Sequence, residues 1–320
     1  MDRGNQALAT AVILMVFLAA CAQGLQSHAS APATDPSGVT MLASHTVGTV
    51  EGQFDAARAM RYLRDVVAFG PRPPASAAHR RLESYLQSHI ASDNLEVDSF
   101  LASTLIGKVS MTNLIARFPG DRDGIIVIAA HYDTAGTVPN FVGANDGGSG
   151  TALLLELSDQ LRNRRLKGYS VWLVWLDGEE AVQKWSNTDG LYGSRQLAKK
   201  WHDDGTAARI KACLVTDMIG DADLNIERDQ GSNSHLEDLI NNAASDLGYQ
   251  SHFFRRTVSM VDDHTSFIAV GIPAADIIDY DYGFNNSFWH TRQDTIDKLS
   301  SRSLQIVGEV LVETVRLLNK

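Results

Sequence analysis

The chain has 320 residues, of which 44% are hydrophobic, so it is long enough to bury the core of one large domain or two small ones. Its formal net charge of −10 argues against nucleic acid or an anionic membrane surface as a partner. The composition also gives no sign of repeats, fibres or general disorder.

The first 20 residues have the features of an export signal. Residues 7–20 form an apolar run that is short for a membrane span, preceded by Arg3 and ended by Leu-Ala-Ala before Cys21. This pattern resembles a bacterial lipoprotein signal, in which cleavage before Cys21 leaves a lipidated thiol and a chain tethered by acyl groups. The alternative is an ordinary secretory signal that is cut near Gly24. Either way we expect an exported protein, in the first case anchored at the bacterial cell envelope only through its N-terminal lipid.

The segment that follows predicts a tether and then a folded domain. Residues 21–51 are rich in Ser, Ala, Thr and Pro and show no apolar period, as in flexible linkers. We therefore expect a signal peptide at 1–20, a lipidated cysteine and tether at 21–51, and one functional domain at 52–320. Once Cys21 is lipidated, Cys213 has no disulfide partner, and its apolar neighbours predict a small core residue.

Hydrophobic periodicity predicts helices and strands that alternate along the domain. Helices are expected at 54–68, 77–90, 151–162, 191–201, 235–247 and 296–318. Strands are expected at 97–105, 111–118, 125–130, 170–176, 210–217 and 274–278, the first two being candidates for a hairpin. This alternation is typical of an α/β protein, so we predict a single-domain, three-layer αβα sandwich with a mostly parallel central sheet and helices on both faces.

Polar side chains follow the expected strands at their carboxyl ends, where open α/β sheets bind their ligands. His131 comes directly after one strand, with Asp133 two residues later as a carboxylate that could fold back onto the imidazole. Glu179 and Glu180 follow another, so that one could bind a metal while its neighbour stays free as a base. A Glu-Glu pair also fits an ordinary solvated turn, and only its combination with the other residues favours a site.

A glycine-rich loop at 143–150 precedes the expected helix at 151–162. Glycines let a backbone approach a ligand closely, and Asp146 is the strong anionic ligand of this loop. A phosphate site is the competing interpretation, because glycine-rich turns that open a helix bind anions. No lysine follows the loop and Asp146 would repel phosphate, so we favour a metal ligand.

Three further strand-end or loop positions complete the set. Asp217 ends the strand at 210–217, and Asp262-Asp263-His264 precede an expected helix start, where one aspartate could simply be an N-cap. His290 lies in a loop beside aromatic residues rather than on an apolar helix face. Histidine and carboxylate ligands without cysteine suit a catalytic zinc, which keeps one coordination position open.

Together these motifs resemble the zinc aminopeptidase superfamily and, within it, the glutaminyl-peptide cyclotransferases (glutaminyl cyclases), from about Arg61 to the C-terminus. The superfamily motifs are His131-Tyr132-Asp133, Asn145-Asp146, Glu179-Glu180, Asp217 and His290. The motifs typical of the cyclases are Asp177-Gly178-Glu179-Glu180-Ala181, Trp185-Ser186, Leu191-Tyr192-Gly193-Ser194-Arg195, Asp262-Asp263-His264 and Trp289-His290-Thr291.

The resemblance implies a zinc-dependent aminoacyltransferase that converts the N-terminal glutamine of peptides and proteins to pyroglutamate with release of ammonia. It implies one Zn²⁺ on Asp146, Glu180 and His290, with Glu179 as the acid/base. It further implies a carboxylate relay of Asp217 and Asp262. Trp185 and Trp289 would wall the substrate pocket, the alternative for both being plain core packing.

The alternative enzyme is a two-zinc aminopeptidase that hydrolyses N-terminal residues. Asp146 would bridge the two ions, His131 and Asp217 would complete the ligand set, and Glu179 would activate a metal-bound water. Asn145 before Asp146 keeps this alternative open, because many animal cyclases have another residue there. Trp185 and the run at 262–264 favour the cyclase. A lipoprotein that only binds would leave the ligands and the acid/base without a use.

Overall fold

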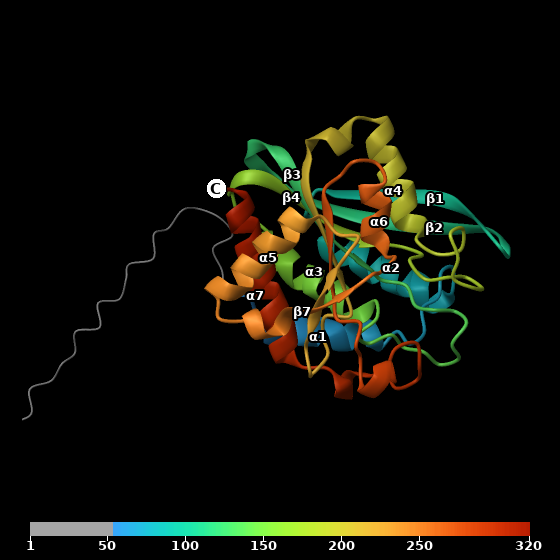
Figure 1. Ribbon diagram of the computed structural model, residues 1–320. Helices are drawn as coiled ribbons and strands as arrows, with labels where there is room; N and C mark the ends of the chain where they lie inside the picture. Colours follow the sequence, from blue (N-terminus) through green and yellow to red (C-terminus); the bar gives the residue numbers. More distant parts are fainter. Residues whose placement is uncertain (1–53) are drawn as a thin grey trace, which may run out of the picture. The chain divides into compact units, whose positions relative to one another are not determined.

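A six-stranded sheet forms the centre of the computed structural model, which describes residues 54–320 (Figure 1). Its strand order is β1 (Leu95–Thr104), β2 (Gly107–Phe118), β4 (Leu166–Leu176), β3 (Gly120–His131), β5 (Ile210–Asp217), β8 (Ala274–Ile278). The four strands β4, β3, β5 and β8 are parallel, and the hairpin of β1 and β2 adds to β4 in the antiparallel sense. The predicted mostly parallel sheet and the hairpin are therefore confirmed, whereas the predicted signal peptide (1–20) and tether (21–51) lie outside the described residues.

Side chains of successive strand residues point to opposite faces, and this alternation builds two cores. Ile126 and Ile128 of β3 pack into the larger core, and Ile125 and Val127 pack into the smaller one. Helices of the larger core are α1 (Ala56–Val67), α2 (Ala77–Ile90), α3 (Gly148–Leu161), α5 (Ser234–Asp246) and α7 (Ser301–Leu318). Helices of the smaller core are α4 (Tyr192–Asp203) and α6 (Asp263–Ile268). The predicted three-layer αβα sandwich is thus confirmed.

The predicted helix at 296–318 is wrong at its start. Residues Ile296–Lys298 form a separate 3-10 turn, and Leu299 then pairs with Asp221 in an isolated β-bridge. Ser300 has extended backbone and accepts a hydrogen bond from the amide of Arg302, so it is the N-cap of α7. Apolar spacing continues across this break, which is why periodicity alone missed the cap.

A second small sheet was not predicted. It consists of β6 (Ile226–Asp229) and β7 (Phe253–Val258), which are parallel to each other. β6 has only four residues, and β7 carries Arg255 and Arg256 side by side, so neither shows a clear alternation of apolar and polar residues. The remaining short elements are the 3-10 turns η1 (Thr206–Arg209), η2 (Gln250–His252), η3 (Phe284–Asn286) and η4 (Ile296–Lys298).

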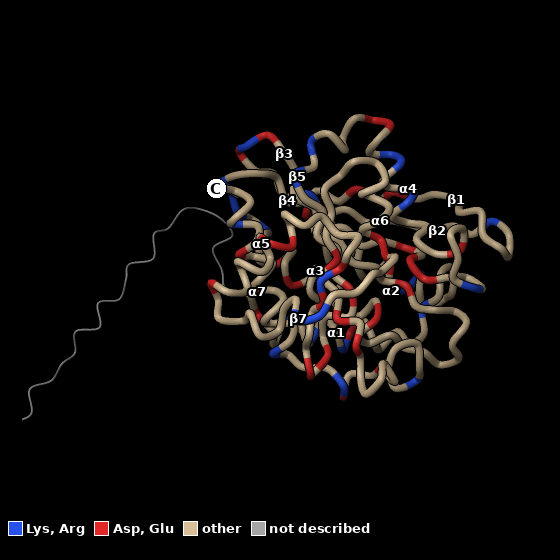
Figure 2. Tube along the Cα trace, viewed as in Figure 1, with Lys and Arg blue, Asp and Glu red and all other residues tan. Residues whose placement is uncertain are grey.

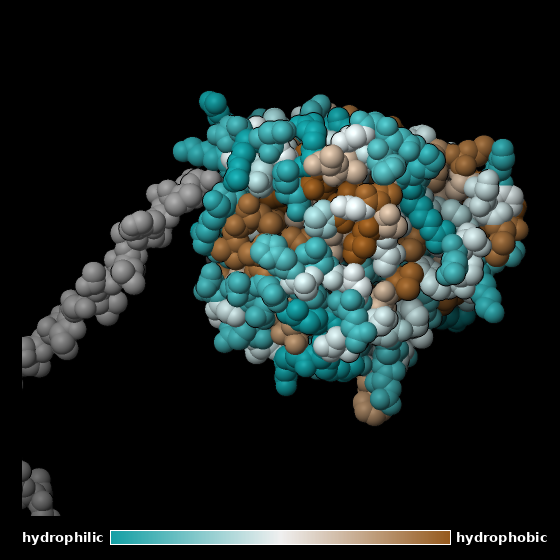
Figure 3. Space-filling model, turned by 45° about the horizontal axis from the view of Figure 1, so that its top comes forward, coloured by the Kyte–Doolittle hydropathy of each residue, from teal (hydrophilic) through white to brown (hydrophobic). Residues whose placement is uncertain are grey.

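The distribution of polarity matters for the site. Acidic positions gather between the labels α3, α6 and α2, although the chain carries Asp and Glu throughout (Figure 2). On the face drawn in Figure 3, apolar side chains reach the surface in patches bordered by hydrophilic ones.

Cys213 is fully buried in the smaller core, as predicted, and burial raises the pKa of its thiol. Within residues 54–320, no helix is both long and apolar enough to cross a membrane.

Candidate active site

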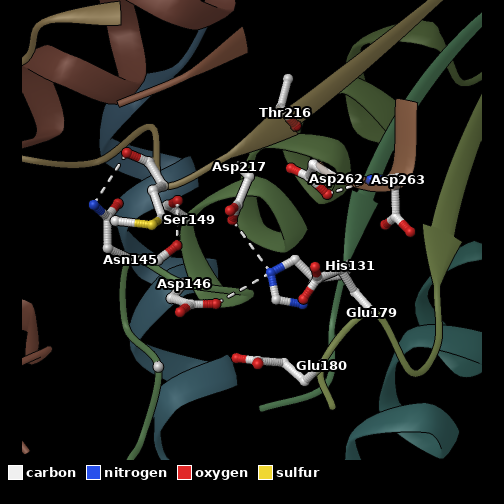
Figure 4. Close-up of polar contacts among 12 residues, drawn as sticks. His131, Asn145, Asp146, Ser149, Glu179, Glu180, Thr216, Asp217, Asp262 and Asp263 are labelled. Atoms are coloured by element: carbon white, nitrogen blue, oxygen red, sulfur yellow. Dashed lines mark hydrogen bonds and ion pairs between the residues drawn. The ribbon is translucent and has the colours of Figure 1, made fainter. Parts of the chain in front are cut away.

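Neighbouring parallel strands bring the predicted polar residues together at one edge of the sheet (Figure 4). His131 is the last residue of β3 and Asp217 is the last residue of β5, and these two strands pair side by side. Glu179 and Glu180 follow β4, which pairs with β3 on its other side. The predicted location at the carboxyl ends of the strands is confirmed.

The glycine-rich loop allows α3 to begin very close to the strand ends. A Cβ atom at Gly147 would lie 2.5 Å from the Asp133 carbonyl oxygen, and one at Gly150 would lie 2.7 Å from the Thr216 carbonyl oxygen. Both distances are shorter than real contacts, so only glycine fits at these positions. The first turn of α3 is buried, which leaves no room for a phosphate group. The glycines therefore serve close packing that presents Asp146 to the site, and the phosphate interpretation fails.

Asp146, Glu180 and His290 form a cluster that can hold a metal ion, with one ligand atom from each lying within 4.8 Å of the others. The Nε2 atom of His290 lies 3.3 Å from Asp146 Oδ2 and 3.2 Å from Glu180 Oε1. Both oxygens are buried and accept no hydrogen bond, so they are available to a cation. Burial disfavours the charged imidazole, yet the two carboxylates raise the pKa of His290 to about 10, which shows how strongly this cluster favours positive charge.

Two buried carboxylates hold the ligand loops in place by accepting hydrogen bonds from backbone amides of the loops. Asp294 accepts hydrogen bonds from the amides of Asn145 (2.7 Å) and Asp146 (3.2 Å). Asp133 accepts hydrogen bonds from the amides of Glu179 (3.1 Å) and Glu180 (3.2 Å). Each carboxylate fixes two consecutive residues, the second of which is a ligand of the proposed metal. Such supporting contacts orient ligands and tune their affinity.

The expected role of Asp133 is only partly correct. Its Oδ1 atom lies 3.5 Å from His131 Nδ1, so the loop does fold back toward the imidazole. That ring nitrogen nevertheless has no hydrogen-bond partner among the described residues. Asp133 instead bonds to the backbone of the Glu179-Glu180 pair, a long-range contact that no spacing in the sequence reveals.

A second possible metal cluster shares one ligand with the first. His131 Nε2 lies 3.3 Å from Asp146 Oδ1 and 3.2 Å from Asp217 Oδ1, and these three residues can also surround an ion. This is the ligand set that a two-metal aminopeptidase needs. Asn145 does not contribute to either cluster, because its side chain donates to the carbonyl of Met218 and accepts from the amide of Gly220.

Carboxylates crowd the same pocket and change each other's acidity. Burial raises the pKa of Glu179 well above its ordinary value, and the carboxylates of Glu180 and Asp262 add to the effect, while His131 opposes it. Burial likewise raises the pKa of Asp217 to about 6. A carboxyl group with a raised pKa can both accept and donate a proton near neutral pH, as an acid/base catalyst must.

Asp262 is a helix N-cap and also lines the pocket. It is the N-cap of α6, where its side chain accepts a hydrogen bond from the amide of Asp263. Its other carboxylate oxygen is buried, has no hydrogen-bond partner and belongs to a residue that lines the pocket. No hydrogen bond joins Asp262 to Asp217 among the described residues, although both face the same cavity.

These groups open into a pocket of about 530 Å³, of a size that suits one short peptide end. Trp185 lines it and is 41% exposed, so core packing is not its role. Trp289 also lines the pocket, where it stacks on the His290 ring with centroids 4.2 Å apart and meets Tyr280 edge to face. Both tryptophans therefore line the cavity, and their contact with a substrate stays a prediction.

Arg72, like Asp294, supports the site and was not revealed by the sequence. Its guanidinium is fully buried and donates hydrogen bonds to the carbonyl oxygens of Tyr132 and Gly143, both at 2.8 Å, and of Val142. Burial lowers its pKa to about 10, against the opposing effect of Asp294 and other nearby carboxylates. The arginine sits between prolines in a helix-ending segment, which gave no hint of such a contact.

The backbone is strained beside the clusters. His290 has φ 49° and Met218, directly after Asp217, has φ 51°, a left-handed conformation that costs a non-glycine residue of order 1 kcal/mol or more. Strain of this kind persists where surrounding contacts fix the geometry, as they do around these two positions.

Comparisons with known proteins agree with this geometry. Residues 113–315 match the model of peptidase family M28. The glutaminyl-peptide cyclotransferase of Drosophila melanogaster is 28% identical over 269 residues, which cover 74% of this chain and 75% of that protein. A solved glutaminyl cyclase from an Acidobacteriales bacterium is 45% identical with a TM-score of 0.81, over 84% of this chain and 96% of that one. A solved zinc-dependent exopeptidase from Parabacteroides distasonis is 25% identical with a TM-score of 0.73, over 82% and 98% of the two chains.

Proposed function

Since this chain belongs to peptidase family M28 and is 45% identical to a solved glutaminyl cyclase, we infer that it is a glutaminyl-peptide cyclotransferase. Such an enzyme converts the N-terminal glutamine of a peptide or protein to pyroglutamate and releases ammonia. The observation that carries the inference is the pocket itself, which combines the Asp146, Glu180 and His290 cluster with a free carboxyl group and two tryptophans.

The donor set fits a zinc ion, because two unpartnered buried carboxylate oxygens and one imidazole nitrogen converge on the pocket. Zinc held by Asp146, Glu180 and His290 would act as a Lewis acid toward the γ-carbonyl of the substrate glutamine. We propose one such ion per chain.

Glu179 would carry the proton in this reaction. The α-amine of the substrate attacks the side-chain amide carbon, so a bond forms between them and the bond from that carbon to the amide nitrogen breaks. The attacking amine loses one proton and the departing nitrogen gains one. Glu179, with its raised pKa and its position on the pocket wall, can take the first proton and deliver it to the leaving group. The products are pyroglutamate and ammonia, and no water is consumed.

Asp217 and Asp262 would position the leaving amide, since both line the pocket and can accept hydrogen bonds from its N–H groups; Asp262 is buried and Asp217 is partly buried. Trp185 and Trp289 would hold the short substrate side chain folded and keep water away. Excluding water has a chemical reason here, because water that attacked the same amide carbon would give glutamate instead of pyroglutamate.

The second function to consider is a two-metal aminopeptidase, which the cluster of His131, Asp146 and Asp217 favours. Purified protein can separate the two by activity on Gln-peptides and Leu-peptides, measured with the metal content of the same preparation. We expect ammonia release and cyclisation with the Gln-peptide, no cleavage of the Leu-peptide, about one zinc per chain, and loss of turnover after chelation. Leu-peptide cleavage that needs two zinc equivalents would instead establish the aminopeptidase.

We also propose that the enzyme is exported and anchored at the cell envelope by a lipid on Cys21. The support is the Leu-Ala-Ala-Cys sequence after a short apolar run and the tether-like composition of residues 21–51. Its substrates would then be peptide and protein N-termini outside the cytoplasm.

A further inference from the structure

One wall of the pocket is a continuous segment that runs from its floor to its rim. Glu180 is 2% exposed at the floor, whereas Gln183, Lys184 and Trp185 are exposed, and all four line the same cavity. The rim also includes the exposed residues Thr137, Ser259 and Val261, and a peptide whose N-terminal glutamine reaches the floor leaves the pocket across this rim. The rim therefore faces the residue that follows the glutamine.

Lys184 is the only lysine or arginine among the described residues that line the pocket. The other charged lining groups are acids apart from His290, which lies against Asp146 and Glu180 in the proposed metal cluster. Lys184 has no ion-pair partner within residues 54–320, so its ammonium group is free to meet a substrate charge. The protein has a net charge of −10, and Lys184 places a positive charge beside a pocket whose other charged lining groups are mostly acidic.

The backbone that carries Lys184 is fixed although its side chain is exposed. Asp189 accepts hydrogen bonds from the amides of Val182 (2.8 Å), Gln183 (2.9 Å) and Lys184 (2.8 Å), and also from the Tyr192 hydroxyl (2.9 Å). A single buried carboxylate thus ties three consecutive residues to the start of α4. The lysine is presented at a constant place on the rim, as a specificity contact requires.

We propose that Lys184 determines specificity for the residue after the glutamine and favours peptides that begin Gln-Glu or Gln-Asp over those that begin Gln-Lys. This deepens the proposed function and depends on it. An exposed pair of opposite charges contributes little, so the preference should be about two- to fivefold at low ionic strength and should shrink as salt screens it.

The test compares kcat/KM for three blocked peptides that begin Gln-Glu, Gln-Ala and Gln-Lys, at low and at high ionic strength. We expect wild-type protein to prefer Gln-Glu to Gln-Lys, Lys184→Gln to remove the preference, and Lys184→Glu to reverse it. Lys167→Gln is the matched control, because it removes the same charge from an exposed lysine at the opposite, amino-terminal end of β4. It should keep the wild-type ratio.

The inference would be overturned if both Lys184 variants kept the wild-type ratio of kcat/KM for Gln-Glu over Gln-Lys. It would also be overturned if Lys167→Gln lost the preference for Gln-Glu as fully as Lys184→Gln, because the preference would then come from the overall charge of the protein. The Gln-Ala peptide separates this outcome from failure of the proposed function. If wild-type protein cyclises Gln-Ala but shows no charge preference, only the specificity inference falls. If it cyclises none of the three peptides, the proposed cyclase function is wrong, and the specificity inference that depends on it is wrong as well.

Discussion

Glu179 and Glu180 are adjacent and chemically identical, yet the structure gives them different surroundings. Glu180 Oε1 lies 3.2 Å from His290 Nε2 in the candidate metal cluster. Glu179 lines the pocket, has a raised pKa and belongs to neither candidate metal cluster. We expect Glu179→Gln to keep zinc and to lower turnover by about 10²-fold or more, which corresponds to about 2.7 kcal/mol of barrier. Glu180→Gln should weaken zinc affinity by at least the ~10- to 100-fold typical of supporting residues, since it removes a ligand.

Loss of folding would not explain either result. Burial raises the pKa of Glu179, and it raises that of Glu180 to about 7, so each carboxylate charge is disfavoured in the folded protein before metal binds. Replacing it by a neutral amide of the same shape should leave the melting temperature of the metal-free protein unchanged or higher. Glu313→Gln, at a partly buried glutamate on α7, is the control for loss of one acidic charge and should change neither zinc content nor rate.

The assay measures zinc per chain after dialysis against a weak chelator, and cyclisation of a Gln-peptide, on the same preparations. Two results would refute the assignment of roles. One is a Glu179→Gln protein whose rate is close to that of the wild type. The other is a Glu179→Gln protein that loses its zinc while Glu180→Gln retains it.

Three further outcomes follow from other contacts. Arg72→Met leaves two buried carbonyl groups and one partly buried carbonyl group without their donor, at about 1–3 kcal/mol each, so thermal unfolding should show a melting temperature at least roughly 6 °C lower. An unchanged value would mean that these hydrogen bonds contribute nothing. Burial acts to raise the pKa of Asp189, but hydrogen bonds from backbone amides lower it below its ordinary value. The Asp189 carboxylate therefore stabilises the folded protein fully above the pKa of an unfolded aspartate, about 3.9. This contribution is lost as the pH falls through the lower pKa of Asp189 in the folded protein. Urea unfolding should therefore show wild type more stable than Asp189→Asn at neutral pH, with a gap that narrows below about pH 4; a constant gap would contradict the linkage. Cys21→Ala should release the protein from membranes or block processing, as cell fractionation would show; normal cleavage with continued membrane attachment would disprove the lipoprotein signal.

The elements of the fold were largely readable from the sequence, because the signals that define them are local. The strand at 210–217 and the helix at 77–90 have the predicted bounds. The strand contains the apolar run 212–215, and the helix follows the N-cap Ser76 and has apolar residues every three to four positions. The helix predicted from residue 296 begins too early, because here the local pattern does not show where the helix starts. Its cap, Ser300, lies inside an apolar period that continues on both sides, and only the pairing of Leu299 with Asp221 shows the break.

The sequence by itself placed His131, Glu180 and Asp217 at strand ends, because a polar residue that ends an apolar strand has to emerge at the edge of the sheet. Only the tertiary structure decided which of these side chains share a ligand and what holds them. Asp294 bonds to the amide of Asp146 from 148 positions away, and Arg72 reaches the Gly143 carbonyl across 71. Such contacts depend on how distant segments pack, and no local period or spacing encodes them.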